Sequence, residues 1–170
     1  MNKNEVQFSI AAARHYSDGE LLKEHKRNDN AMCHYAFSSE CGLKAFLEIF
    51  LNKDILFWSE YDLDKLGKVF LNKKSSFIKK IKIHDVDELW KYYNWLSLVV
   101  PDYALLTELE SSPSVLFDNH PDRRYYDNQY YTDDDIESSR QYAKALLERL
   151  IACTIDGRIQ YPCTKKENKQ

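Results

Sequence analysis

The strongest constraint on the fold is a repeat between residues 32 and 50. Small or apolar side chains recur there at alternating spacings of four and three, at Met32, Ala36, Ser39, Leu43, Phe46 and Phe50. This spacing places them on one face of an α-helix, which Asn28 or Asn30 can cap. The opposite face carries Glu40, Lys44 and Glu48 at four-residue spacing, which predicts a solvated surface with two charge pairs.

Three further segments are predicted to be helical. Residues 4–26 form the first, with an apolar stripe of Val6, Ile10, Ala13 and Leu21. A later helix begins at His84–Asp85, because Asp85 and Glu88 are spaced as a capping box, and it ends before Pro101. Its stripe is Leu89, Tyr93 and Leu96.

The last predicted helix begins at Thr132, which has Asp135 three residues after it. The acids of this first turn complement the positive end of the helix dipole. The predicted buried face consists of Ile136, Ala143, Leu146, Leu147, Leu150 and Ile151.

Together these segments predict an all-α fold, an antiparallel four-helix-type bundle with a long excursion at residues 52–83 between the second and third helices. Only four glycines and four prolines among 170 residues agree with long uninterrupted elements. Residues 1–162 are predicted to form a single domain, and residues 163–170 a disordered tail.

Composition excludes several classes of function. The net charge of -3 is not that of a nucleic-acid coat protein, so any nucleic-acid contact must come from a local patch. No stretch approaches 18 apolar residues and no basic-apolar leader is visible, so we expect a cytoplasmic protein with no membrane partner. Its four cysteines, Cys33, Cys41, Cys153 and Cys163, form no CxxC pair, and we expect reduced thiols and neither a metal ion nor a cofactor.

Three segments in order carry a resemblance to a known family. Residues 30–47 (NAMCHYAFSSECGLKAFL) combine an alanine-bearing stripe with Glu40 and a Leu-Lys-Ala stretch. Residues 83–89 (IHDVDEL) give a His-Asp-aliphatic helix start, and Arg124–Tyr125 precedes a Thr-initiated last helix. The set is similar to the HEPN superfamily (higher eukaryote and prokaryote nucleotide-binding) and spans about residues 4–157.

The resemblance implies a helical bundle that forms homodimers and belongs to a toxin–antitoxin or antiviral defence system. It also implies RNA or a nucleotide as ligand, and a cognate nucleotidyltransferase or another defence protein as partner. The first hypothesis is therefore an RNA- or nucleotide-binding module or partner subunit. The alternative is an enzyme, because many members are metal-independent endoribonucleases with an Arg-x(4–6)-His motif.

That motif is missing from the last helix, because no histidine follows His120. The match in this chain is Arg27 to His34, at the start of the second helix. Both side chains would project from one face if the helix began before Arg27. His34 would then act as general acid or base, and Arg27 would stabilise the charge of the transition state. The alternative reading is a helix-start arginine and a partly buried histidine.

Two other regions are candidate ligand contacts. Residues 65–83 contain seven lysines and no acid, and we single out Lys73, Lys74, Lys79 and Lys80 as phosphate contacts. Arg123, Arg124 and Tyr125 combine guanidinium groups with an aromatic face, which suits a nucleotide. The open alternatives are a solvated excursion for the lysines and a loop packed over the bundle or the dimer mate for Arg123 to Tyr125.

Overall fold

A computed structural model describes residues 7–51, 84, 86, 89–91, 93–94, 122–125 and 130–156, without the side chains of 48–51, 123 and 124. The elements are α1 (Phe8–Glu24), α2 (Asn28–Leu51), the 3₁₀ helix η3 (Asp122–Tyr125) and α7 (Asp133–Ile155). Residues 86, 89–91 and 93–94 are helical as well, and no described residue lies in a strand. The all-α prediction is confirmed for the described residues.

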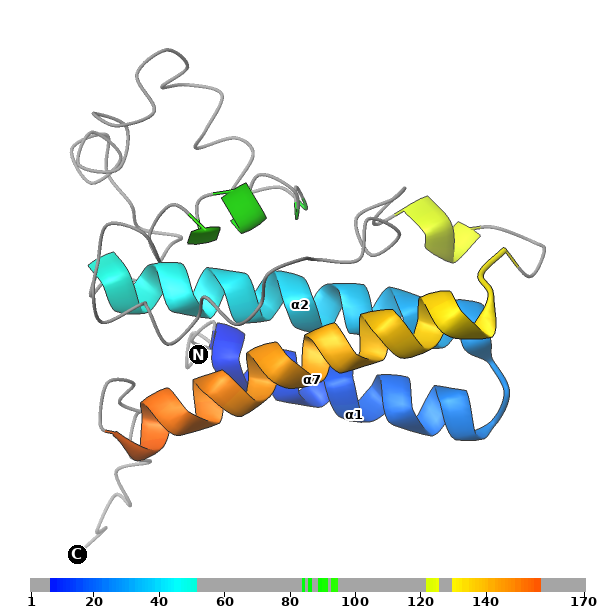
Figure 1. Ribbon diagram of the computed structural model, residues 1–170, viewed down its shortest axis with the longest axis horizontal. Helices are drawn as coiled ribbons and strands as arrows, with labels where there is room; N and C mark the ends of the chain where they lie inside the picture. Colours follow the sequence, from blue (N-terminus) through cyan, green and yellow to red (C-terminus); the bar gives the residue numbers. More distant parts are fainter. Residues whose placement is uncertain are drawn as a thin grey trace, which may run out of the picture.

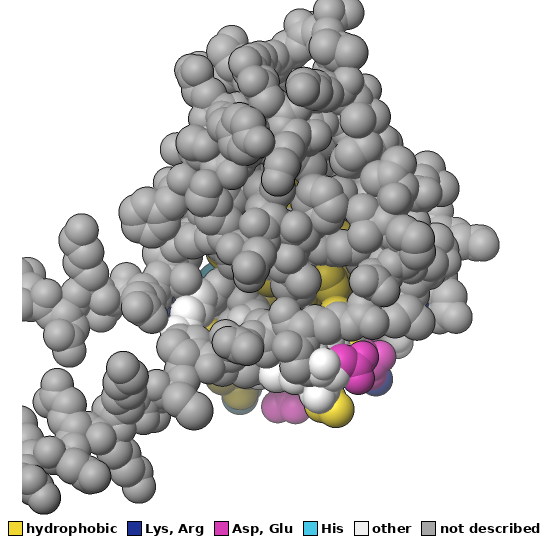
Figure 2. Space-filling view, turned by 90° about the vertical axis from the view of Figure 1, so that its left-hand side faces the viewer, with side chains coloured by type: hydrophobic (Ala, Val, Ile, Leu, Met, Phe, Trp, Pro, Cys, Tyr) yellow, Lys and Arg dark blue, Asp and Glu magenta, His cyan; other side chains and the backbone are white. Residues whose placement is uncertain are grey.

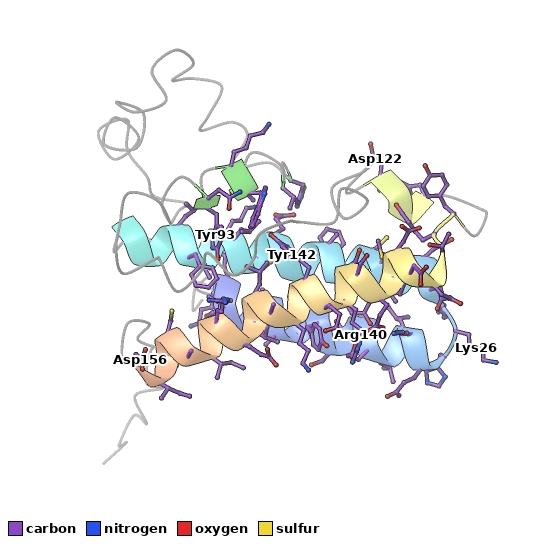
Figure 3. All side chains as sticks on the ribbon, in the orientation of Figure 1. Lys26, Tyr93, Asp122, Arg140, Tyr142 and Asp156 are labelled. Atoms are coloured by element: carbon purple, nitrogen blue, oxygen red, sulfur yellow. The ribbon has the colours of Figure 1, made fainter. Side chains whose placement is uncertain are left out.

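Helices α1 and α2 form an antiparallel hairpin through a three-residue turn. The turn satisfies the end of α1, because the Lys26 N–H donates to Lys23 O and the Arg27 N–H donates to Leu22 O, both at 2.9 Å. Lys26 takes the left-handed conformation that this closing motif needs, with φ 57°. Lys26 therefore sits where glycine is usual, and Figure 3 shows it pointing away from the bundle.

Helix α7 lies along both other helices and runs in the same direction as α2 (Figure 1). Its first turn has the predicted capping box: the Thr132 hydroxyl accepts from the Asp135 N–H, and the Asp135 carboxylate accepts from the Thr132 N–H. Asn28 Nδ2 donates to Asp133 Oδ1 at 3.3 Å, which joins the starts of α2 and α7. The antiparallel arrangement of α1 and α7 follows.

A charged network, here called the arginine network, joins α1, α2 and α7. Arg140 donates from Nε and from one terminal nitrogen to the two oxygens of Glu20, at 2.7 and 2.8 Å. The Tyr35 hydroxyl donates to the same Glu20 at 2.7 Å. Glu137 accepts from Arg140 at 3.0 Å and also pairs with Lys23. Figure 3 shows Arg140 between α7 and α1.

The core surrounds α2. Met32, Leu43 and Phe46 of the predicted stripe are fully buried, with Ala36 and Ser39. The helical residues after His84 pack on the same core: Tyr93 meets Phe46 with ring centroids 5.6 Å apart, and Trp90 meets Tyr142 of α7 at the same separation. Phe50 and Leu96 of the predicted stripes lie outside the described side chains, and Leu89 and Tyr93 are buried as predicted.

The predicted stripe of α1 is wrong. Ile10 and Leu21 are 48% and 55% exposed, while the buried positions are Ala12 and Gly19. Phe8, Tyr16 and Leu22 pack beside them, so the inward face combines small and aromatic residues. A prediction based on aliphatic residues alone therefore selects the wrong face of α1. The face that packs against α2 carries small residues, because these allow the two helices to approach closely.

The solvated face predicted for α2 is also wrong. Glu40 and Lys44 are only 3% and 5% exposed, and Glu48 lies outside the described side chains. The reason is the central position of α2, which packs against α1, α7 and the helical residues near Val86 and Leu89. A central helix has no fully solvated face, so the charge pair is buried within the protein.

Most of the predicted face of α7 is confirmed: Ile136, Ala143, Leu146 and Leu150 are buried. Leu147 is half-buried and Ile151 is exposed, because each follows a buried leucine by one residue and so lies about 100° round the helix from the buried face. Among the described residues, no helix is both long enough and apolar enough to cross a membrane.

The excursion at 52–83 and the tail at 163–170 lie outside the described residues.

Candidate functional site: a histidine face on the α1–α2 hairpin

A close approach of α1 and α2 fixes the register of the hairpin. A Cβ atom on Gly19 would lie 2.7 Å from Tyr35 Cε1, so only glycine fits between the helices at this point. Farther from the α1–α2 turn, the Ser38 hydroxyl donates to Ala12 O at 2.9 Å and connects the two helices a second time. The antiparallel register that results places the residues before Gly19 on α1 opposite His34 and Phe37 on α2.

Three metal- or proton-binding side chains meet at this register. His15 and Asp18 lie three residues apart on one face of α1, and His34 faces them from α2. One donor atom from each of the three lies within 4.8 Å of the other two. His34 Nδ1 is 3.7 Å from Asp18 Oδ2, and the two imidazole centroids are 5.4 Å apart. All three residues are partly buried.

Both histidines have an unsatisfied ring nitrogen. Nδ1 of His15 and Nδ1 of His34 are buried and have no hydrogen-bond partner among the described residues. Burial lowers the pKa of His15, and the charges of His34 and Arg14 lower it further, while Asp18 and Glu40 act in the opposite direction. A neutral imidazole with an unpaired nitrogen is a ready proton acceptor or metal ligand.

Phe37 connects this group to a second one. Its ring lies 5.3 Å from His15, 6.4 Å from His34 and 6.2 Å from His84, measured between centroids. His84 in turn contacts the buried Glu40, with Nδ1 at 2.8 Å from Oε2. We call the surface formed by His15, Asp18, His34, Phe37 and His84 the histidine face.

Two of the described side chains, Lys44 and His84, contact Glu40. Lys44 Nζ donates to Oε1 at 2.6 Å, and His84 donates from Nδ1 to Oε2, because a carboxylate can only accept. Lys44 also lies 5.3 Å from the centre of the Phe8 ring, a cation–π distance. The buried carboxylate therefore fixes the orientation of the His84 ring, whose side chain is 49% exposed. A carboxylate that orients a solvent-facing imidazole is an arrangement used for binding and for proton transfer.

The Arg-x(4–6)-His match, Arg27 to His34, spans the start of α2. Helix α2 begins at Asn28, and Arg27 O accepts the first helical hydrogen bond, from the Ala31 N–H at 2.9 Å. The condition for a shared face, a helix that begins before Arg27, is not met. Arg27 is exposed in the turn, whereas His34 belongs to the histidine face.

The other predicted contacts are only partly described. Arg123 and Arg124 lie in η3, with side chains outside the described ones, and Tyr125 is 73% exposed at its end. Lys73, Lys74, Lys79 and Lys80 lie outside the described residues.

His15 and Asp18 are the site residues that sequence reasoning missed. The available signal was their spacing on α1 together with a short turn, since a short turn makes an antiparallel hairpin. Counting back from the turn places them opposite Phe37 and His34. That counting requires the turn bounds and the close approach at Gly19, which the sequence pattern left open.

The comparisons with known proteins add no relative: no family model, no curated protein and no solved structure matches this chain. The described residues therefore characterise the chain as a helical protein with a histidine-carboxylate face beside its first hairpin.

Proposed function

We propose that this chain is a HEPN-type helical domain that binds RNA or a nucleotide through its histidine face. The observation that carries the proposal is the contact of His84 with Glu40. It joins two of the segments that resemble the family, residues 30–47 and 83–89, which lie far apart in the sequence. A solvent-facing imidazole with a buried charged partner is a feature that favours a functional site.

The chemistry of the face suits a base and its ribose better than a bare phosphate. Phe37 and the neighbouring imidazoles offer aromatic surfaces, on which bases stack with little sequence preference. Asp18 and Glu40 are negative and would repel a phosphate, but they favour hydroxyl and amino donors. Phosphates would be bound by Lys73, Lys74, Lys79, Lys80, Arg123 and Arg124. The exposed ring of Tyr125 supports a further stacking contact.

Fluorescence anisotropy with single-stranded RNA, in EDTA, tests the proposal. His84→Ala is expected to weaken binding by about 5- to 100-fold, the scale of one lost stacking contact. His25→Ala is the matched control, because His25 is exposed in the α1–α2 turn, away from the face. Circular dichroism checks that both variants are helical. If the native chain binds neither RNA nor a nucleoside triphosphate, or if His84→Ala changes nothing, the proposal is wrong.

A second candidate, a metal-independent endoribonuclease, is favoured by the position of His34 beside Asp18 and His15. His15, whose pKa is lowered by burial, would accept the proton of a ribose 2′-hydroxyl. The 2′-oxygen would attack phosphorus, the bond to the 5′-oxygen would break, and His34, beside Asp18, would protonate that leaving oxygen. The products are a 2′,3′-cyclic phosphate and a 5′-hydroxyl. This assignment keeps His34 from the sequence motif and replaces Arg27 by His15.

Incubation of RNA with the protein in EDTA separates the two candidates. The nuclease predicts cyclic phosphate ends and a loss of about 10²–10⁴-fold in rate for His34→Ala. RNA that is bound but remains intact favours the binding module.

The proposal includes a two-fold homodimer, or assembly with a partner such as a nucleotidyltransferase. Exposed aliphatic side chains on α1 and α7 support it, namely Ile10, Leu21, Ile151 and Ile155. Figure 2 views the molecule from the end where α1 begins and α7 ends, and hydrophobic side chains lie beside acidic ones at its lower edge. Light scattering at micromolar concentration is the test, and a monomer with no partner would contradict it.

A further inference from the structure

The histidine face contains a donor set that RNA binding does not require. His15 and His34 each have a buried Nδ1 with no hydrogen-bond partner among the described residues, and Asp18 offers a carboxylate oxygen close to both imidazoles. Two imidazoles and one carboxylate are a frequent ligand set of transition-metal ions, and of Zn²⁺ in particular.

The distances are close to those that a metal ion needs. In a tetrahedral zinc site with bonds of about 2.0–2.1 Å, the ligand atoms lie roughly 3.4 Å from one another. Here the three donor atoms lie within 4.8 Å, and His34 Nδ1 to Asp18 Oδ2 is already 3.7 Å. The donor atoms must therefore move about 1 Å closer together to reach zinc-ligand separations, a displacement on the scale of side-chain adjustment.

We propose that His15, Asp18 and His34 bind a divalent transition-metal ion, with Zn²⁺ as the fitting ion. Three protein ligands leave one tetrahedral position for water or an anionic oxygen, on the partly exposed side of the site. Mg²⁺ and Ca²⁺ do not fit, because both ions require oxygen ligands and the set contains a single carboxylate.

The scaffold holds the three donors before any ion binds. They come from two helices rather than from loops, and the Gly19–Tyr35 approach fixes the helices beside Asp18 and His34. Little ordering is therefore left for metal binding to accomplish.

Calorimetric titration of Zn²⁺ into the full chain, produced without a histidine tag and freed of metal with EDTA, tests the site. We expect one ion per chain and a loss of affinity of about 100-fold or more for His15→Gln, Asp18→Asn or His34→Gln. Loss of an outer-shell partner alone costs about 10–100-fold, so loss of a direct ligand should cost at least as much. His25→Gln is the matched control and should bind like the native chain.

A second measurement needs no variant. In a proton NMR spectrum of the native chain, Zn²⁺ should shift the imidazole resonances of His15 and His34 and leave that of His25 unchanged. Millimolar Mg²⁺ should not compete. The proposal is overturned if Zn²⁺ binding does not saturate, if all variants bind alike, if Mg²⁺ competes with Zn²⁺, or if His25 is the residue that responds.

The result of the Zn²⁺ titration does not depend on whether the proposed RNA-binding function is correct. RNA binding and cleavage are measured in EDTA, whereas the metal site is measured without RNA. A chain that binds Zn²⁺ but not RNA leaves the metal site standing and removes the proposed function; the reverse result does the opposite.

Discussion

The two sides of α1 differ in whether their partly buried polar groups have hydrogen-bond partners. On the side that meets α7, Glu20 accepts from Arg140 at both oxygens and from Tyr35, so each of its oxygens has a hydrogen-bond donor. On the side that meets His34, the buried Nδ1 atoms of His15 and His34 have no partner among the described residues. Both regions are partly buried and both cross between helices.

The difference separates a structural network from a candidate site. A satisfied network of charged groups holds helices in register. Unpaired buried nitrogens cost free energy in the resting protein, and they are retained where a ligand or a proton completes them. The arginine network should therefore respond to mutation in stability, and the histidine face in binding.

The largest effect on stability is expected at Gly19, because the arginine network and the histidine face both depend on the close approach of α1 and α2 at this residue. Gly19→Ala would place a Cβ 2.7 Å from Tyr35 Cε1, so the helices must separate or Tyr35 must move. We expect a loss of about 1–3 kcal/mol, in spite of the better helix propensity of alanine.

Gly42→Ala is the matched control for that change. Its Cβ would meet Leu146 at 3.6 Å, an ordinary contact, so this variant should gain up to about 1 kcal/mol from propensity. Urea unfolding measures both variants. Equal effects would show that the approach at Gly19 is not what fixes the hairpin.

Arg140→Met should have the next largest effect. It removes the paired hydrogen bonds to Glu20 and leaves the Tyr35 hydroxyl as the donor to that carboxylate within the arginine network. We expect a loss of about 1–2 kcal/mol, because hydrogen bonds to charged groups contribute more than neutral ones. Arg140→Lys should recover only part of it, since an ammonium cannot make the paired contact. Full recovery by lysine would mean that net charge alone matters.

A smaller effect is expected from acid. The hydrogen bond from Lys23, followed by that from Gln141, holds the pKa of Glu137 at about 2, below its ordinary value of 4.5. A lowered pKa in the folded state means that the contribution is complete above about pH 4.5 and is lost as the pH falls toward about 2. Because the side chain is 43% exposed, we expect under about 1 kcal/mol.

Urea midpoints of the native chain and of Glu137→Gln, followed from about pH 6 to about pH 2, measure this contribution. The two curves should converge at the acid end. A gap that widens there would reverse the sign of the argument.

The smallest effect on stability should come from the histidine face. His34→Gln removes no hydrogen bond of Nδ1, so the unfolding free energy should change by about 0.5 kcal/mol or less. The same thermal and urea curves that report Gly19→Ala provide the comparison. A loss above about 2 kcal/mol would make His34 a structural residue and erase the contrast between the two sides of α1.

Local patterns were sufficient for the buried face of α2 and for the start of α7. The repeat from Met32 to Phe46 predicted a buried helical face, and Thr132 with Asp135 predicted the start of α7, both of which the structure bears out. Helix caps and apolar periodicity depend on residues a few positions away, so the sequence contains all the information needed to predict them.

The candidate site was only partly accessible in the same way. His34 was singled out from a motif, yet the sequence paired it with Arg27, seven positions away on the chain. Its actual neighbours are Asp18 and His15, which reach it across the hairpin. Motif spacing measures separation along the chain, whereas these contacts depend on how α1 and α2 pack against each other.

The sequence by itself determined that the described part of the chain is helical and where α2 and α7 place most of their apolar faces. Only the tertiary structure decided which polar residues are buried. Glu40 and Lys44 have the spacing of a solvated pair, and they become internal because α2 is enclosed by its neighbours. Burial is a property of the whole packing, and it alone turns Glu40 into the partner that orients His84.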